Sequence, residues 1–320
     1  MSSVFLSGFE SMVEALARIF IIIVVAGFLV RKNVITQNHI DALSKVTVVV
    51  LLPSLVFSNT LQHFNPSSLP YWWLLPVAGV FMSVVGLLFA AGVFITDLGK
   101  QRNLIAVASM QNAGYLVLPI GQVVYPEHFT EFALITFLFI LGYNPFLWSV
   151  GTYLVTSSER PSFDIKKIIT PPAVANIISL ILVLSGTGDI FPSVLVDSID
   201  LTGQAAVPVA TFVLGATLGS ESLKRLPGLR DIIRVVSVKY VLLPLFTVAV
   251  LYYFDIGKSH PLLADFFIIQ AAAAPATGLI LQVRAYGGDV HKIAGMMIVA
   301  YLICLLALPF WIAFWHSLSI

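Results

Sequence analysis

Charge and cysteine are scarce in this sequence. Only 10% of its 320 residues are charged, whereas an ordinary soluble domain has about 25%. Lys and Arg (17) nearly balance Asp and Glu (16), so no basic surface is available to bind nucleic acid. The single cysteine, Cys304, can form neither an internal disulfide bond nor a thiolate metal cluster. The composition therefore excludes an ordinary soluble domain and a nucleic-acid partner, and it suggests no metal and no cofactor.

Hydrophobic residues are abundant: they make up 58% of the chain, and the mean hydropathy is +0.97. A helix needs about 20 apolar residues to cross a bilayer. Backbone polar groups in hydrocarbon must be paired internally, which a helix achieves and an open sheet does not. We therefore predict an all-α polytopic protein of the lipid bilayer with ten transmembrane helices. Their approximate ranges are 11–31, 42–61, 71–96, 103–124, 131–155, 167–187, 202–219, 232–254, 263–283 and 293–315.

The basic residues fall on alternate connections between these helices. Fourteen of the seventeen Lys and Arg residues lie in or beside the odd-numbered connections, and the even-numbered ones contain only Lys258. Connections rich in Lys and Arg stay in the cytoplasm, so the odd-numbered connections are predicted to be cytoplasmic. Both termini then lie outside the cytoplasm. The predicted location is the cell (inner) membrane, which the chain crosses many times.

The two halves of the sequence resemble each other. Residues 43–61 align with 201–219 at an offset of 158 positions, and residues 125–133 align with 286–294 at an offset of 161. Two nearly equal offsets close to half the chain length indicate a five-helix repeat, with halves 1–156 and 157–320. Each repeat has an odd number of helices, so the second copy must be inverted in the membrane. Inverted repeats recur in secondary transporters.

Helices 4 and 9 carry helix-breaking residues in corresponding positions. Helix 4 contains Gly114 and Pro119, helix 9 contains Pro275, and Gly114 aligns with Pro275 at the offset of 161. Proline removes a backbone donor and glycine weakens a helix, so both helices are expected to break and to cross near the midplane. Backbone groups freed there are tolerated only beside a cavity or a ligand. Simple kinks are the alternative interpretation.

Polar side chains gather at the two predicted breaks. Amides and hydroxyls are costly in lipid and usually face the interior of a helix bundle. The second half of each broken helix begins at the break, so its positive N-terminal end attracts an anion. No Asp or Glu lies in the middle of a predicted helix, which argues against ion coupling through a carboxylate. The candidate substrate-binding residues are Gln111, Asn112, Gly114, Tyr115, Gln270, Pro275 and Thr277.

Other polar positions have two interpretations. Arg18 follows Glu14 by four residues on helix 1, which favours an ion pair at the membrane rim. Lys239 lies on helix 8 about a turn beyond Arg234, and we expect its side chain to reach the cytoplasmic interface. Either cation would be the counter-charge of the anion if it faced the cavity. The candidate residues of the cavity wall are Pro53, Ser54 and Asn59 of helix 2.

Three stretches of the sequence carry a resemblance to a known family. Helix 4 contains Gln111-Asn112-Ala113-Gly114-Tyr115-Leu116-Val117-Leu118-Pro119, and helix 2 contains Leu52-Pro53-Ser54-Leu55-Val56-Phe57. Helix 9 contains Ala274-Pro275-Ala276-Thr277, followed by Tyr286-Gly287-Gly288-Asp289. Each stretch resembles the corresponding signature of the auxin efflux carrier family, whose helix-4 signature is usually Gly-Asn-Thr-Gly-Phe-Leu-Gly-Leu-Pro. Gln111, Ala113 and Val117 depart from it, and Gly278 stands where the family commonly has Asn.

The resemblance implies a five-plus-five inverted repeat with crossed helices 4 and 9, similar to sodium/proton antiporters and bile-acid symporters. It implies a scaffold domain of helices 1, 2, 6 and 7, often dimeric, and a moving transport domain of helices 3–5 and 8–10. Plant members export the auxin anion, and bacterial relatives carry small carboxylates such as malate or malonate. The short central connection is that of a compact prokaryotic member. The implied function is secondary active transport of a small organic anion by alternating access.

Three other functions are weighed against this one. A sodium-coupled symporter of a larger organic anion, of the bile-acid symporter type, would keep the same fold. An intramembrane enzyme is disfavoured, because the sequence contains no His-Glu-x-x-His zinc motif, no Gly-x-Ser-x-Gly motif and no paired membrane aspartates. A channel is a further alternative, and counterflow distinguishes a carrier from a pore.

Overall fold

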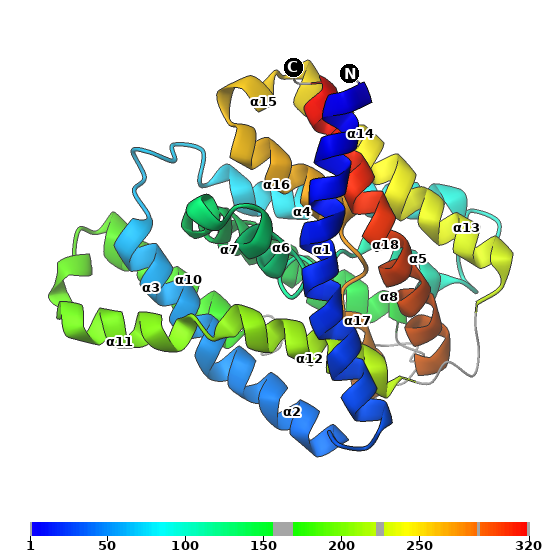
Figure 1. The fold of residues 1–320 in the computed structure, drawn as a ribbon, viewed down its shortest axis with the longest axis horizontal. Coiled ribbons are helices and arrows are strands. Elements are labelled where there is room, and N and C mark those ends of the chain that lie inside the picture. Colours follow the sequence, from blue (N-terminus) through cyan, green and yellow to red (C-terminus); the bar gives the residue numbers. More distant parts are fainter. Residues whose placement is uncertain (1, 156–168, 222–226, 287–288, 319–320) are drawn as a thin grey trace.

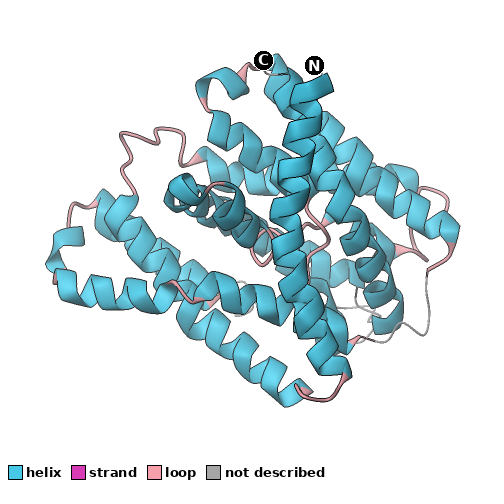
Figure 2. Cartoon of the chain, in the orientation of Figure 1, coloured by secondary structure: helices cyan, strands magenta, loops and turns pink. Residues whose placement is uncertain are grey.

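The computed structural model describes residues 2–155, 169–221, 227–286 and 289–318. In these ranges the regular structure is helical (Figure 2), apart from an isolated β-bridge between Gln111 and Pro275. The prediction of an all-α protein is confirmed. The predicted boundary between the two halves, at residues 156 and 157, lies outside the described residues.

The helices of the first half are often joined end to end. Three of their short elements are not α-helical: η1 and η3 are π-helical turns, and η2 is a 3-10 turn. In chain order the elements are α1 (Ser2–Arg31), α2 (Gln37–Val46), η1 (Thr47–Leu51), α3 (Leu52–His63), α4 (Leu74–Val93), α5 (Arg102–Ser109), α6 (Val117–Val124), η2 (Pro126–His128), α7 (Phe129–Phe146), η3 (Leu147–Gly151) and α8 (Thr152–Val155).

The helices of the second half follow a similar plan, with a π-helical turn at η5 and a 3-10 turn at η4. Pro53 and Pro244 follow η1 and η5 within two residues, and Pro145 lies just before η3. A proline removes one helical hydrogen bond, which a wider π-turn accommodates. The elements are α10 (Pro171–Leu184), η4 (Gly188–Ile190), α11 (Ser193–Gly203), α12 (Ala206–Ser220), α13 (Leu229–Ser237), η5 (Val238–Leu242), α14 (Leu243–Tyr253), α15 (Ile256–Ser259), α16 (Pro261–Ala272), α17 (Gly278–Tyr286) and α18 (Val290–Leu318).

Seven helical runs of the described chain are long and apolar enough to cross a membrane. They are Gly8–Arg31, Gln37–His63, Leu74–Val93, Pro126–Val155, Ser193–Ser220, Leu229–Tyr253 and Val290–Leu318. α10 and α16 are apolar but shorter. Large apolar side chains on the outer faces, such as Ile21, Val24 and Phe28 of α1, are more than half exposed. Such a surface is stable in contact with lipid and unfavourable in water.

The helices pack in two groups that meet along α1 (Figure 1). α3 packs against α10 and α11, and α12 packs against α1 and α2. The second group contains α4, α5, α7, α14, α16 and α18, and α1 also contacts α18. Close approach within the second group depends on small residues: a Cβ on Gly142 would lie 1.8 Å from the Pro76 carbonyl oxygen. α1 begins and α18 ends at the same end of the molecule (Figure 1).

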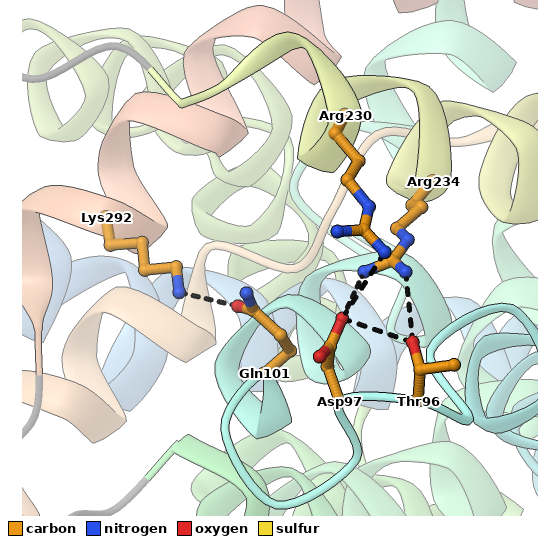
Figure 3. A network of polar contacts seen from close by, with 6 residues as sticks. All are labelled: Thr96, Asp97, Gln101, Arg230, Arg234 and Lys292. Carbon is orange, nitrogen blue, oxygen red and sulfur yellow. Dashed lines mark hydrogen bonds and ion pairs between the residues drawn. The ribbon is translucent and has the colours of Figure 1, made fainter.

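Polar contacts hold the connection between α4 and α5 against α13 and α18 (Figure 3). Asp97, in the connection after α4, accepts a hydrogen bond of 2.8 Å from Arg234 of α13 and lies 3.9 Å from Arg230. Lys292 of α18 donates to the Gln101 side chain, just before α5, at 2.6 Å. The hydrogen bond from Arg234 lowers the pKa of the Asp97 carboxyl below its ordinary value. The network fixes the start of α5, the helix that leads to the candidate site.

Candidate binding site at the crossing of two interrupted helices

Two helical segments are interrupted near the centre of the molecule, and their interruptions cross. The chain is not helical between α5 and α6, nor between α16 and α17. Gln111 and Pro275 face each other in the antiparallel bridge. Asn112 N–H donates to the Ala274 carbonyl at 2.7 Å, and Ala276 N–H donates to the Met110 carbonyl at 3.2 Å. The two interruptions therefore satisfy part of each other's backbone, as buried polar groups require.

The residues that pair across the two interruptions differ slightly from those that the sequence repeat aligns. The offset of 161 aligns Gly114 with Pro275, whereas the bridge pairs Gln111 with Pro275. Gly114 lies within the first interruption, but Pro119 lies in the first turn of α6. Proline is tolerated in a first turn because its missing N–H has no helical partner there. Pro119 thus belongs to the start of the second half-helix rather than to the interruption.

Buried side chains hold the crossing in place. Asn112 Nδ2 donates to the Tyr301 hydroxyl at 2.6 Å, and that hydroxyl donates to the Pro275 carbonyl at 3.1 Å. The Tyr143 hydroxyl donates to the Gln111 carbonyl, and Gln270 Nε2 donates to the Ala113 carbonyl at 3.2 Å. Side chains of α7, α16 and α18 therefore replace the helical hydrogen bonds that the two interruptions lack.

A cavity of about 230 Å³ lies beside the crossing. Both interruptions contribute to it, through Gln111 to Tyr115 and through Ala276 and Thr277. α3, α10 and α12 form the opposite wall with residues such as Val56, Asn176 and Val213. Most of the lining is apolar, and none of the described lining residues has a charged side chain.

Three lining residues have buried polar atoms without a hydrogen-bond partner. Both amide atoms of Gln111 are unpartnered, as are Asn176 Oδ1 and Thr170 Oγ1. The Gln111 side chain is fully buried. An unpartnered buried polar group costs about 1–3 kcal/mol. These atoms expose almost no surface, so a polar ligand or water in the cavity would reach them only after neighbouring side chains shift.

Two of the four half-helices, α6 and α17, direct their N-terminal ends toward the cavity. α6 and α17 begin at the cavity, which Leu118 and Gly278 line, so their N-terminal ends point toward it. α5 and α16 end at Ser109 and Ala272, which are not among the lining residues of the cavity. An N-terminus near an anion contributes up to about 2 kcal/mol in a partly buried site. Desolvation of a carboxylate costs several kcal/mol, so hydrogen bonds from side chains must supply the remainder.

The predicted binding residues divide into two sets. Gln111, Asn112, Gly114, Tyr115 and Thr277 line the cavity. Pro275 and Gln270 lie behind it, where they shape the crossing rather than its surface.

The predicted wall residues of helix 2 do not line the cavity. Leu52 and Val56 line it, whereas Pro53, Ser54 and Asn59 are not among the lining residues. The predicted helix is correct, but its cavity-facing side is the apolar one.

The polar groups within and just before α10 were not predicted from the sequence. Asn176 and Thr170 line the cavity, and Asn176 Nδ2 donates to the Phe137 carbonyl at 2.9 Å. An asparagine inside an apolar segment is costly in lipid, and that signal alone would have identified Asn176 as facing the interior.

The expectation for Lys239 is wrong. Its side chain is fully buried and does not reach an interface, and Nζ donates to the Met110 carbonyl at 3.0 Å. Lys239 is not a lining residue of the cavity either. Arg18, by contrast, forms the expected exposed ion pair with Glu14, at 2.8 Å.

A crossing of two interrupted helices beside a cavity, within a bundle of membrane-spanning helices, is characteristic of a membrane transporter. A family model described as "Membrane transport protein" matches residues 11–162 and 155–312, nearly the whole chain. The chain belongs to this family, the auxin efflux carrier family, whose members are transporters and not enzymes. The predicted membership of the auxin efflux carrier family is thereby confirmed.

Individual relatives are distant. An uncharacterized transporter of Methanothermobacter thermautotrophicus is 22% identical over 91% of this chain and 94% of its own length. An uncharacterized transporter of Methanocaldococcus jannaschii is 24% identical over 64% of this chain and 69% of the relative. Protein PIN-LIKES 3 of Arabidopsis thaliana is 29% identical over 50% of this chain. That match covers 43% of the plant protein's length.

Proposed function

We propose that the protein is a secondary active carrier of a small organic anion that works by alternating access. One observation carries this proposal: the fully buried amide of Gln111 has no hydrogen-bond partner at the wall of a cavity. The N-terminal ends of α6 and α17 point toward the same cavity and favour negative charge there. Gln111, Asn112, Gly114, Tyr115 and Thr277 are the proposed binding residues, with Asn176 added from α10.

The lining of the cavity supports an anion with an apolar body. Phe137, Ile140, Leu147 and Val213 are among the lining residues, and the described lining offers no Lys or Arg for a second carboxylate. A carboxylate at the half-helix ends with an aromatic or aliphatic body against these side chains fits this pattern. A dicarboxylate such as malate or malonate would leave one charge without compensation, so we expect it to bind more weakly.

The proposed mechanism divides the bundle as the family resemblance implies. Ten membrane segments form a five-plus-five inverted repeat. The scaffold consists of helices 1, 2, 6 and 7, which correspond to α1, α2–α3, α10 and α11–α12. The transport domain consists of helices 3–5, which correspond to α4, α5–α6 and α7–α8, and of helices 8–10, which correspond to α13–α14, α16–α17 and α18. The position of the cavity supports this division, because the cavity lies between α3, α10 and α12 on one side and the crossing on the other. α1 of the scaffold also packs against α18 of the transport domain. Movement of the crossing against the scaffold would expose the cavity alternately to each side. The scaffold also provides the proposed homodimer contact.

The cavity is proposed to face the cytoplasm in this conformation. Lining residues such as Ser44, Trp148 and Thr217 lie in the parts of their helices next to connections rich in Lys and Arg. By their positive charge these connections lie in the cytoplasm, and both termini lie on the other side of the cell membrane.

Thermal stabilisation of the detergent-purified protein tests the proposal. Indole-3-acetate, benzoate, malate and malonate are each compared with the corresponding neutral amide, in sodium and in choline buffer. We expect the aromatic monocarboxylates to raise the melting temperature and their amides not to. Stabilisation that requires sodium would instead favour the sodium-coupled symporter of a larger anion. Equal stabilisation by acid and amide would remove the argument for an anion.

A further inference from the structure

Lys239 is a buried basic residue without an acidic partner among the described ion pairs. It lies in the π-helical turn η5, its side chain has no exposed surface, and the ion pairs between described residues do not include it. An ammonium group loses several kcal/mol of hydration when it is buried. A charged Lys239 therefore needs compensation from some other feature of the protein.

The compensating groups are backbone carbonyls at the C-terminal ends of the half-helices, on the side of the crossing that faces away from the cavity. Nζ of Lys239 donates to the carbonyl oxygen of Met110, the residue that caps the C-terminal end of α5. The turn η5 also contacts α16 and α18. The carbonyl oxygen of Ala272, the last residue of α16, accepts a hydrogen bond of 3.6 Å from the thiol of Cys304 in α18. Lys239 thus lies among the elements that carry both C-terminal ends.

The partial charges of the two helix ends are opposite in sign to that of an ammonium group and similar to it in size. The C-terminal end of a helix carries about −0.5 of an elementary charge. Two such ends, those of α5 and α16, together correspond to about one negative charge, which one ammonium group neutralises. Transporters with broken helices that are coupled to sodium use unwound carbonyls and half-helix C-terminal ends to coordinate the ion. Here the side chain of Lys239 donates to a carbonyl of that kind.

We infer that Lys239 is a built-in cation of the crossing: its ammonium group takes the place that a coupling cation would otherwise occupy. Lys239 is therefore a positioning residue for the two interruptions, and binding and transport need no sodium. The transport consequence rests on the proposed carrier function. The structural role of the cation does not depend on it, so the test below uses no anion.

The test replaces the side chain by one that leaves room for a small cation. Lys239→Ala removes the ammonium group and opens a space, whereas Lys239→Met removes the charge and fills the space. The melting temperature of each purified variant is measured in propylammonium, sodium and choline chloride at equal ionic strength. Wild-type protein and Lys258→Ala, which alters an exposed lysine, serve as controls.

We expect the melting temperature of the wild type, that of Lys258→Ala and that of Lys239→Met each to be independent of the salt. Lys239→Ala should melt several degrees lower than the wild type in choline, and propylammonium or sodium should raise its melting temperature in a saturable manner. If Lys239→Ala cannot be purified in choline, its recovery with propylammonium gives the same readout. Identical behaviour of Lys239→Ala in all salts would overturn the inference, and so would a response of Lys239→Met or sodium dependence of the wild type. None of these results bears on whether a carboxylate binds.

Discussion

Asn112 reaches Pro275 through one hydroxyl group, that of Tyr301. The hydroxyl accepts a hydrogen bond from Asn112 Nδ2 at 2.6 Å and donates one to the Pro275 carbonyl at 3.1 Å. It links the first interruption to the second from a third element, α18. The orientation of a proposed binding residue is therefore set by the residue that interrupts the other helix.

This link predicts strong coupling between Asn112 and Tyr301. Tyr301→Phe leaves both partners without the hydroxyl, and we expect a loss of about 1–3 kcal/mol in stability. Asn112→Ala in the Tyr301→Phe background should cost much less than it does in the wild type. A double-mutant cycle of unfolding free energies measures the difference. Tyr253→Phe, on an exposed side chain, is the control. Additive effects of the two changes would contradict the link.

The Gln111 side chain is predicted to lower the stability of the empty protein and to contribute to ligand binding. Gln111→Leu replaces an amide whose two polar atoms are unpartnered, so the empty protein should gain about 1–3 kcal/mol of stability. The same variant should lose stabilisation by an aromatic carboxylate. Gln270→Leu is the matched control, because Gln270 donates to the Ala113 carbonyl and its loss should destabilise the protein. A destabilised Gln111→Leu variant that still binds the carboxylate would show that this amide has a structural role.

The Asp97 network predicts a pH dependence. The hydrogen bond from Arg234 lowers the pKa of Asp97, so the contribution of this carboxylate is complete above its ordinary value of 3.8. The contribution is lost as the pH falls through the lowered folded-state value. Melting temperatures between pH 6 and pH 3 should fall less steeply for Asp97→Asn than for the wild type. Asp255→Asn, in an exposed pair with Lys258, should keep the slope of the wild type. Parallel curves for Asp97→Asn and the wild type would exclude Asp97 as the cause.

The proposed orientation is tested by cysteine labelling. The only native thiol, Cys304, is fully buried and should give no background. Lys258→Cys lies in an even-numbered connection and should react with a membrane-impermeant maleimide on intact cells. Asn38→Cys, next to the first connection, should react only after the cells are opened. The reverse pattern would invert the protein in the membrane and place the cavity on the outer side.

Much of this architecture could be predicted from the sequence, because bilayer physics leaves few choices. Long apolar runs must be helical, and Gly114 and Pro275 indicated both interruptions. Side-chain direction was harder to predict. Pro53 and Ser54 were assigned to the cavity wall, but Leu52 and Val56 of the same helix line it. A π-turn precedes α3, and the sequence does not show how it rotates the residues that follow.

The side-chain direction of Lys239 was even harder to predict from the sequence. Its position near other basic residues favoured an interfacial side chain, and a lysine can reach far enough to leave the hydrocarbon. The structure instead directs it to the Met110 carbonyl, a group that becomes available only because α5 ends inside the bundle. The acceptor is a product of the tertiary fold, so no local pattern around residue 239 could reveal it. Asn176 of α10 lies far in the sequence from the two breaks, so their polar pattern does not indicate it.

Counterflow in proteoliposomes tests the central claim most directly. Vesicles loaded with unlabelled indole-3-acetate are placed in labelled indole-3-acetate, and uptake is compared for the wild type, Asn112→Ala and the exposed-site control Asn38→Ala. The account predicts accelerated uptake by the wild type and Asn38→Ala, and none above empty vesicles by folded Asn112→Ala. Accelerated uptake by Asn112→Ala equal to that of the wild type would contradict the site. Uptake by the wild type that internal anion does not accelerate would contradict a carrier.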